Sequence, residues 1–422
     1  MHTLAQLKSG QLAGITRLTL SENLSTFPTE ILSLADSLEI LDLSNNQLSA
    51  LPNELKKLTK LKIIFASNNH FETLPESLGK CESLEMVGFK SNKIKHVPAE
   101  SLPAKLRWLI LTDNNIPSLP DNLGERPRLQ KLALAGNQLT QLPSNLTQLT
   151  NLELVRISAN QLTECPDQLL ALPKLAWLAF SGNPFTRTDI DIQSVPVVPY
   201  SSFALQNVLG QGASGVISKA VWNKPTDDFP DEIAVKVFKG ELTSDGYPED
   251  ELQACLKVGG HACLVKSLAQ VNEQDCLALV MQLIPEHYNN LGLPPDFDTC
   301  TRDTFKVGFT LSIEQISKIV KQMQSVFAHL HDNQVSHGDL YAHNTLLDHD
   351  ANIIVGDFGA ATMYHMLNEK QQARVQQIER RALNYFIEDL LSVCAEEDKN
   401  SSEYTLLTKS VTGLVEDQPE LL

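Results

Sequence analysis

The first half of the chain repeats one arrangement of apolar and polar positions, LxxLxLxxNxL. The arrangement occurs eight times, with successive copies 23 residues apart and a single step of 22. The alternation L-x-L within each copy has the period of a short strand, and the rest of the copy returns the chain to the next strand. One copy cannot bury its apolar edge alone, so the copies are expected to stack around one continuous core. The copies start at Ile15, Leu38, Leu61, Leu84, Leu106, Leu129, Leu152 and Leu175.

An asparagine and, in most copies, a proline recur at fixed places. The asparagine amide can bond backbone groups of neighbouring turns, which predicts a ladder inside the curve. The proline ends the strand and sets the return path. This is the leucine-rich repeat pattern, and it resembles the short bacterial-type or Ras-suppressor-like class, so we expect an α/β leucine-rich-repeat solenoid over residues 1–190. The asparagines are Asn23, Asn46, Asn69, Asn92, Asn114, Asn137, Asn160 and Asn183, and the prolines are Pro28, Pro52, Pro75, Pro98, Pro120, Pro143 and Pro166.

The strand positions expected on the concave face of this solenoid form an apolar stripe with two tryptophans. Such positions are commonly charged in this class of repeat, so the stripe predicts a surface that binds a protein partner. The alternative is that a flanking segment, or the second half of the chain, covers it. The residues of this concave stripe are Ile63, Phe65, Met86, Trp108, Ile110 and Trp177.

The second half has a different pattern, in which strand-like runs alternate with helical segments. The run EIAVKVF at 232–238 is rich in β-branched residues, and LALVMQLIP at 277–285 predicts a buried strand that ends in a hinge. Between them, residues 248–261 predict a helix with acidic residues in its first turns. Apolar residues recur at helical spacing over 312–331.

Candidate chemistry follows that helix, in HGDLYAHN at 337–344 and DFG at 357–359. Phosphoryl transfer requires a carboxylate that orients the attacking hydroxyl, and an amide and a second carboxylate that hold a metal on the phosphates. The three candidates are Asp339, Asn344 and Asp357.

A glycine-rich segment precedes both motifs. Gly210, Gly212 and Gly215 have GxGxxG spacing, which lets backbone N–H groups approach phosphate oxygens. The same spacing occurs in dinucleotide-binding folds, where a helix follows the glycines. Here the strand-like run VISKAVW follows, so the segment predicts a glycine-tipped hairpin. Lys236 on the next strand is then placed to pair with the α- and β-phosphates.

In this order, the motifs resemble those of the eukaryotic-like protein kinase family over roughly the second half of the chain. The resemblance implies a bilobal α+β domain over 203–422, with an N-lobe at 203–284 and a C-lobe at 285–422. It implies that Asp339 is the catalytic base, that Asn344 and Asp357 hold Mg²⁺, and that Lys236 pairs with an acidic residue in the active state. We choose Glu251 as that partner, with Glu249 and Asp250 as alternatives.

The resemblance also implies ATP as cofactor. Met281 takes the gatekeeper position, and backbone groups of Gln282 and Ile284 meet the adenine. The full set expected to bind the nucleotide is Gly210, Gly212, Gly215, Ile217, Ala234, Lys236, Glu251, Met281, Gln282, Ile284 and Leu346.

The chain departs from the family pattern at several positions. Gly338 replaces the arginine of the HRD motif, which predicts activity without phosphorylation of the activation loop. Tyr341 stands where a lysine usually neutralises γ-phosphate charge, and His343 is a candidate to compensate in part. Glu379 takes the place of an aspartate that braces the catalytic loop. No APE motif follows DFG, so we expect a reduced C-lobe.

Composition narrows the partners and the compartment. The net charge of −17 argues against a nucleic-acid partner, because a phosphate backbone requires a basic surface. Seven cysteines without metal-ligand spacing are typical of a reducing compartment. We see no apolar run of membrane-spanning length and no signal peptide, and we expect a cytoplasmic protein.

Two connecting segments remain. A short junction at 191–202, stiffened by Pro196 and Pro199, should join the two domains closely. Residues 286–311 form an irregular insertion, for which we favour a surface loop over a segment that borders the nucleotide site.

These observations favour an ATP- and Mg²⁺-dependent protein kinase, of the Ser/Thr type, whose repeats recruit or sense a protein. A nucleotide-binding pseudokinase scaffold is the first alternative, since the APE motif is missing and Tyr341 replaces the lysine that usually neutralises γ-phosphate charge. A small-molecule kinase is the second, and the repeat array argues against it.

Overall fold

The computed structural model describes residues 1–187, 195–212, 214–224, 228–240 and 242–412, which form two compact units. The first unit contains Met1–Leu175, Gly182–Arg187 and Ser244–Gly246. The second contains Ala176–Ser181, Thr188–Thr243 and Tyr247–Leu422. The units therefore exchange two short segments, so the borders differ from a single boundary near residue 190. The first four residues of the predicted junction 191–202 lie outside the described residues.

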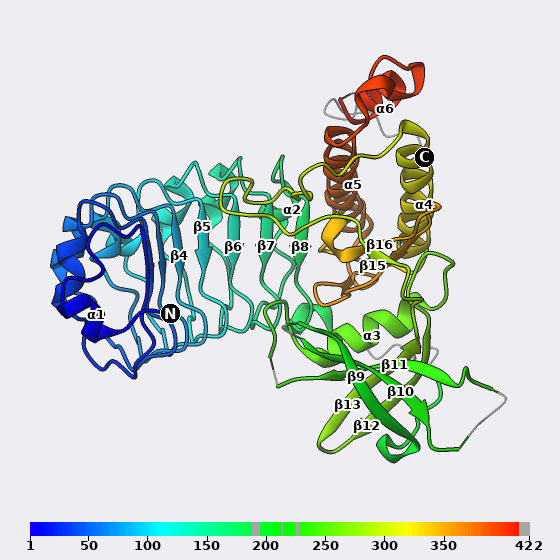
Figure 1. Cartoon of the computed structure of the whole chain (residues 1–422), viewed down its shortest axis with the longest axis horizontal. Coiled ribbons are helices and arrows are strands. Elements are labelled where there is room, and N and C mark those ends of the chain that lie inside the picture. Colours follow the sequence, from blue (N-terminus) through cyan, green and yellow to red (C-terminus); the bar gives the residue numbers. More distant parts are fainter. Residues whose placement is uncertain (188–194, 213, 225–227, 241, 413–422) are drawn as a thin grey trace. The chain divides into compact units, whose positions relative to one another are not determined.

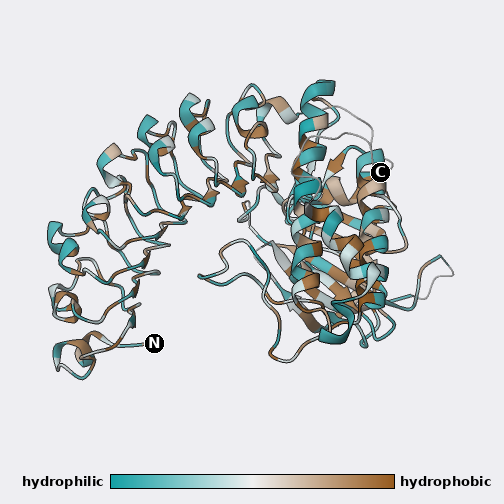
Figure 2. Cartoon of the chain, turned by 90° about the horizontal axis from the view of Figure 1, so that it is seen from above, coloured by the Kyte–Doolittle hydropathy of each residue, from teal (hydrophilic) through white to brown (hydrophobic). Residues whose placement is uncertain are grey.

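The first unit is a solenoid whose short strands line its inner side, as Figures 1 and 2 show. Each strand covers three residues and pairs in parallel with the next, in register, so the predicted leucine-rich-repeat fold is confirmed. The sheet runs in the order β1 to β8, and its last strand, β8, is counted with the second unit. Its strands are β1 (Arg17–Thr19), β2 (Ile40–Asp42), β3 (Ile63–Phe65), β4 (Met86–Gly88), β5 (Trp108–Ile110), β6 (Lys131–Ala133), β7 (Leu154–Arg156) and β8 (Trp177–Ala179).

Short helical turns form the outer side of the repeats. Most of them follow a proline, whose fixed φ suits the residue that enters a turn. The helix α1 (Leu4–Lys8) precedes the first strand and begins with a capping box at Thr3. The turns are η1 (Thr29–Leu34), η2 (Asn53–Lys57), η3 (Leu78–Lys80), η4 (Ala99–Ser101), η5 (Asp121–Glu125), η6 (Ser144–Gln148), α2 (Asp167–Leu170) and η7 (Pro184–Thr186).

The predicted asparagine ladder is present in the interior of the repeats. The Nδ2 of Asn114 donates to the backbone oxygens of Phe89 and Leu111 at 3.0 Å each, and its Oδ1 accepts from the Ile94 N–H at 2.9 Å. One side chain thus satisfies backbone groups of two successive turns that no strand partner reaches. The same pattern occurs at Asn69 and Asn160.

The second unit begins with an antiparallel sheet in the order β12-β13-β11-β10-β9, beside the helix α3. Apolar residues of the sheet and of α3 form two clusters, one of which joins α3 to β11 and β13. The helix starts at Pro248 and ends before Gly259, whose φ of 67° is the left-handed conformation that glycine adopts readily. The elements are β9 (Phe203–Gln211), β10 (Gly215–Trp222), β11 (Glu232–Phe238), α3 (Pro248–Val258), β12 (Ser267–Glu273) and β13 (Cys276–Gln282), preceded by η8 (Tyr200–Ser202).

The rest of this unit is mainly helical, and capping boxes at Ser312 and Asn368 start its two long helices. The helices are α4 (Ile313–Asp332), α5 (Glu369–Ser392) and α6 (Ser402–Thr412), with the turns η9 (Ala342–Asn344) and η10 (Glu396–Asp398). Two small sheets contain β14 (Asn289–Asn290), β16 (Thr345–Leu347) and β17 (Ile353–Val355), and β15 (Val335–Ser336) with β18 (Thr362–Met363). Within the described part of the chain, none of these helices has the length and apolar character needed to cross a membrane.

Candidate active site

Lys236 and Glu251 form a buried ion pair. Lys236 lies in the middle of β11, opposite Ile217 of β10 and Leu279 of β13, and Glu251 lies in the first turn of α3. The Lys236 Nζ donates directly to the Glu251 Oε1, and the two residues are only 7% and 4% exposed. Burial lowers the pKa of Lys236, but the carboxylates of Glu251 and Asp357 outweigh it and hold this pKa above its ordinary value. The lysine therefore stays charged.

The structure thus selects Glu251 among the three acidic candidates. Glu249 is exposed, and Asp250 shares a hydrogen bond with Ser181 instead. The helical period explains the choice, because residues one position apart on a helix point about 100° away from one another.

The second group of site residues is the loop after β15. The Asn344 Nδ2 donates to the Asp339 Oδ2 at 2.8 Å and to the Asp339 backbone oxygen at 3.0 Å, so one amide fixes both the loop and the carboxylate. Glu379 of α5 accepts from the backbone N–H groups of His337 and Gly338 at 2.8 Å and 3.3 Å. Glu379 therefore braces this loop, as predicted from its position in the sequence.

The third group is the DFG turn. Asp357 has a φ of 52°, a left-handed conformation that costs energy in a residue with a side chain. Its Oδ1 accepts from the Gly359 N–H at 3.3 Å. The His337 ring lies 5.1 Å from the Phe358 ring, and its Nε2 is 3.0 Å from the Gly356 backbone oxygen. A buried histidine thus joins the loop of Asp339 to the turn of Asp357.

These groups fit a hard divalent cation. The Nδ2 of Asn344 is engaged by Asp339, which leaves the amide oxygen for a metal, and Asp357 offers a carboxylate. Oxygen atoms are the preferred ligands of Mg²⁺, which usually takes one or two protein ligands and completes its shell with phosphates and water. Asn344 and Asp357 are the residues that would hold it.

The glycine segment forms the predicted hairpin. β9 and β10 pair antiparallel, and the Gly212 N–H donates to the Gly215 oxygen at 3.0 Å. A Cβ at Gly215 would lie 2.5 Å from the Val237 oxygen, so this position excludes a side chain, whereas Gly210 and Gly212 have open space. No helix follows the glycines directly, and the dinucleotide-fold alternative is therefore wrong.

Some of the residues expected to bind the adenine lie close together in the structure. Ala234 and Met281 are cross-strand partners, 5% and 9% exposed, in a cluster that Ile217 borders. Gln282 ends β13 with its side chain exposed, and Ile284 follows it, half-buried. Leu346, also half-buried, lies on β16.

Comparison with known proteins agrees with this geometry. Residues 203–380 match the family model described as protein kinase domain, and residues 37–58 match that of a leucine-rich repeat. Residues 203–380 are a protein kinase domain.

This kinase domain accounts for the similarity to curated proteins. The serine/threonine-protein kinase PITSLRE of Drosophila melanogaster is 28% identical over 168 residues, 38% of this chain and 16% of the fly protein. A putative L-type lectin-domain containing receptor kinase of Arabidopsis thaliana is 41% identical over 182 residues, 41% of this chain and 32% of that protein. The chain thus spans about a third or less of the curated relatives that it matches.

A solved structure is also similar to part of this chain. An internalin of Listeria monocytogenes is 26% identical, with a TM-score of 0.34, and the similarity covers 40% of this chain and 47% of the internalin.

One residue of the kinase domain that braces the catalytic loop was missed at the level of sequence. Asp303, in the insertion 286–311, is 7% exposed and accepts from the Ala342 N–H. Its other oxygen lies 2.6 Å from the His343 Nδ1. The neighbouring Arg302 binds Asp389 of α5 at 2.7 Å, which holds the segment in place. The preference for a plain surface loop is therefore wrong here, because a buried carboxylate of the insertion braces the catalytic loop.

The concave stripe also needs a correction. Trp177 is 1% exposed, and its ring stacks on Tyr341 of the kinase domain at 4.7 Å, so it is not available to a protein partner. The repeat period could not reveal this, because Trp177 occupies the same place in its copy as Trp108. Ile63 and Met86 are also buried, whereas Phe65, Trp108 and Ile110 are half-buried.

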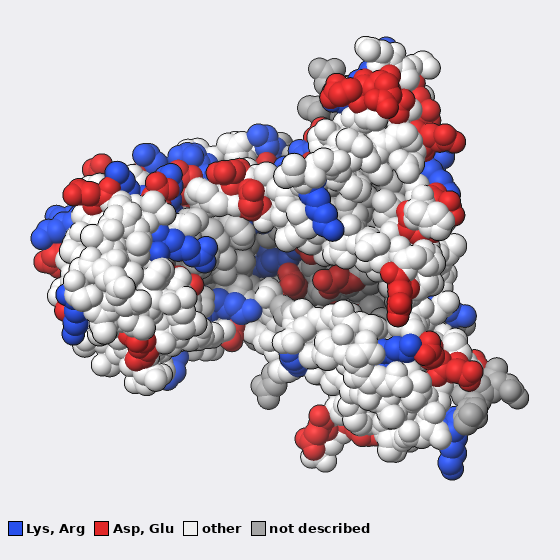
Figure 3. Space-filling view, in the orientation of Figure 1, with Lys and Arg blue, Asp and Glu red and all other residues white. Residues whose placement is uncertain are grey.

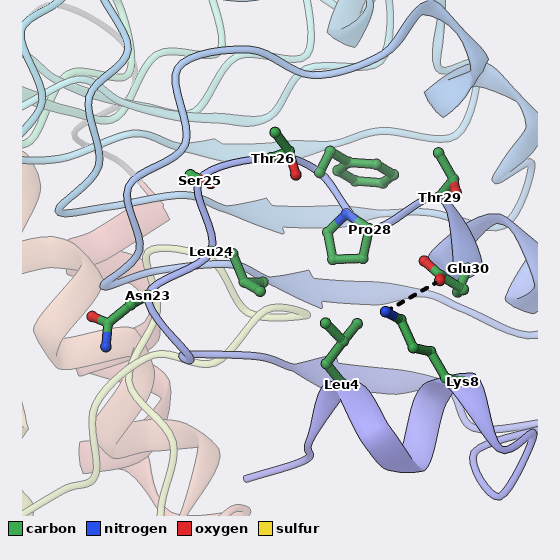
Figure 4. Close-up of a pocket in the computed structure, with 10 residues that line it drawn as sticks. Leu4, Lys8, Asn23, Leu24, Ser25, Thr26, Pro28, Thr29 and Glu30 are labelled. Atoms are coloured by element: carbon green, nitrogen blue, oxygen red, sulfur yellow. Dashed lines mark ion pairs between the residues drawn. The ribbon is translucent and has the colours of Figure 1, made fainter.

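An open hollow lies beside the first repeat and the helix α1 (Figure 4). It contains an ion pair of 3.8 Å between Lys8 and Glu30, both well exposed, and segments 23–30 supply most of its lining. None of the candidate residues for phosphoryl transfer is among its lining residues.

Proposed function

We propose that this chain is an ATP- and Mg²⁺-dependent protein kinase that phosphorylates serine or threonine. One observation carries the proposal: the Lys236–Glu251 ion pair is formed in the same structure in which Asn344 holds the Asp339 carboxylate. Both arrangements have to exist together for transfer.

Each of these residues has a separate role in phosphoryl transfer. When bound, ATP would supply the γ-phosphoryl group, and Mg²⁺ would supply positive charge that neutralises the phosphates. Lys236 orients the α- and β-phosphates, and Glu251 holds the lysine in position. Asn344 and Asp357 are the residues that would hold the metal ion. Asp339 orients the acceptor hydroxyl and takes its proton as the oxygen–phosphorus bond forms and the bond to ADP breaks.

Ser/Thr acceptors are favoured by the similarity to the fly serine/threonine kinase. We propose further that the repeats recruit a protein through Phe65, Trp108 and Ile110, which stay partly exposed. On the face in Figure 3, Lys and Arg side chains alternate with Asp and Glu over the described residues of the repeats, which suits a protein rather than a nucleic acid. The seven unpaired cysteines support a cytoplasmic location.

The test is mass spectrometry of the purified chain after incubation with Mg-ATP, beside an Asp339→Asn control. We expect phosphoserine or phosphothreonine on the wild type, and a loss of about 10²-fold or more in rate for the variant, with unchanged ATP binding. ATP binding without phosphate on the wild type or on added protein substrates would favour the nucleotide-binding scaffold, which Tyr341 in place of a lysine also suggests.

A further inference from the structure

Strand β8 belongs to the same compact unit as the kinase domain, although it continues the sequence pattern of the repeats. Its first residue, Trp177, donates from the indole Nε1–H to the backbone oxygen of Leu340 at 2.9 Å. Leu340 directly follows Asp339. The indole therefore holds the peptide unit next to the proposed catalytic base.

Aromatic stacking strengthens this contact. The Trp177 ring lies 4.7 Å from the Tyr341 ring with 9° between the planes, and 5.4 Å from the Tyr385 ring with 20° between the planes. Tyr341 is 4% exposed and stands where the family usually has a lysine. Its role here is therefore to pack, since its ring is covered by a second aromatic ring and cannot extend toward a phosphate.

The backbone of the same strand explains Gly338. This residue has a φ of 69°, and a Cβ there would lie 2.8 Å from the Leu178 oxygen and 2.6 Å from the Ala360 oxygen. Both are backbone atoms, which cannot rotate away. No side chain fits between β8 and the start of the activation segment, so the absence of arginine before Asp339 is a packing requirement.

Phe180, the residue directly after β8, also holds the segment after DFG. The Phe180 N–H donates to the Thr362 Oγ1 at 3.2 Å, and Thr362 is 1% exposed. Thr362 in turn pairs with Ser336, two residues before Gly338. The strand β8 and the residue after it therefore contact the segments on both sides of the metal-binding groups.

We propose that β8 is the positioning element of the catalytic loop, and that Trp177 fixes the orientation of Asp339 through Leu340 and Tyr341. This inference rests on the proposed kinase function. Trp177 acts through its contacts with Leu340 and Tyr341, so it is a positioning residue. The catalytic loop is then ordered by this strand without phosphorylation of the activation segment.

The experiment compares Trp177→Phe and Trp177→Ala with the wild-type full chain, and uses Trp222→Phe of strand β10 as a matched control, because the Trp222 Nε1–H also donates to a backbone oxygen, that of Pro230 at 3.1 Å. Trp177→Phe keeps a ring for the stack and removes the indole donor. We measure kcat and KM for ATP, the thermal midpoint, and hydrogen exchange of residues 337–344. We expect kcat to fall about 10-fold in Trp177→Phe and about 10²-fold in Trp177→Ala, with KM for ATP unchanged. Exchange in 337–344 should rise in both Trp177 variants, and Trp222→Phe should match the wild type in kcat and in exchange of this loop.

A loss of kcat with an equal rise in KM, or unchanged exchange in 337–344 in both variants, would overturn the inference. If the wild type transfers no phosphate, the proposed function fails. Hydrogen exchange then decides whether β8 orders this loop, independently of activity. If Trp177→Ala does not fold, Trp177→Phe supplies both readouts.

Discussion

Arg156 and Asp245 form an ion pair, with 2.6 Å between the Arg156 Nε and the Asp245 Oδ1. Arg156 ends strand β7 in the repeats, and its side chain is only 5% exposed. Asp245 belongs to the segment Ser244–Gly246, which the first compact unit includes. Lys90 donates to the Ser244 Oγ at 3.0 Å in the same segment. Two residues after this segment, α3 begins at Pro248 and carries Glu251.

The first prediction concerns this ion pair. Asp245→Ala leaves a buried guanidinium with one partner fewer, which should lower the free energy of unfolding by about 1–3 kcal/mol. It also loosens the chain that enters α3, so the Lys236–Glu251 pair should form less often and kcat should fall several-fold. Urea unfolding and initial rates measure the two effects.

The matched control for Asp245→Ala is Glu39→Gln, which breaks the more exposed pair with Lys62. Exposed pairs contribute about 0–1 kcal/mol, so this variant should keep both stability and rate. Equal rates in Asp245→Ala and the wild type would show that the segment Ser244–Gly246 has no influence on α3.

The second prediction distinguishes two roles of Lys236, which are to neutralise the buried Glu251 carboxylate and to take part in phosphoryl transfer. Lys236→Met should stop transfer, and it should also destabilise the fold by about 3–5 kcal/mol because Glu251 remains buried without its cation. The double variant Lys236→Met with Glu251→Leu removes both charges. We expect it to recover most of the stability and none of the activity.

Chemical denaturation gives the free energy of unfolding of each variant, and a nucleotide-binding assay gives its affinity for ATP. A single variant Lys236→Met as stable as the wild type would mean that Glu251 finds water or another partner. Recovery of activity in the double variant would remove Lys236 from the mechanism.

The sequence predicted the parts of this molecule that depend on short spacing. The 23-residue period defines each strand and each ladder asparagine, because every copy has the same neighbours. Asp339 and Asn344 are five residues apart in one loop, so their hydrogen bond follows from local geometry. To predict Glu251 as the partner of Lys236 required only the register of the helix α3 against the strand β11.

The residues that were missed depend on contacts between distant segments. Trp177 meets Leu340 across 163 positions, and Asp303 meets His343 across 40. Nothing in the local sequence distinguishes Trp177 from Trp108, since both occupy the same place in a repeat. The exchange of segments between the two units is likewise set by tertiary packing, which the period does not encode.

The third prediction concerns pH and Asp250 in the first turn of α3. Burial, and then the nearby carboxylate of Glu249, raise the pKa of Asp250 from 3.8 to about 6, although a hydrogen bond with Ser181 opposes the shift. The folded protein therefore holds this proton more tightly than the unfolded chain does. Its contribution to the free energy of unfolding is fully present below about pH 4 and is lost as the pH rises through about 6.

Asp250→Asn should remove this dependence, because the amide keeps a hydrogen-bonding group and cannot ionise. The variant should gain about 1–3 kcal/mol over the wild type between about pH 4 and pH 7. Urea unfolding over this pH range gives the difference in free energy of unfolding between the variant and the wild type. The titration of every other group cancels in this difference. Glu249→Gln should lower the Asp250 pKa and move the transition to lower pH. Parallel stability curves for Asp250→Asn and the wild type would show that Asp250 titrates alike in the folded and unfolded states, and that its burial in α3 does not matter to the fold.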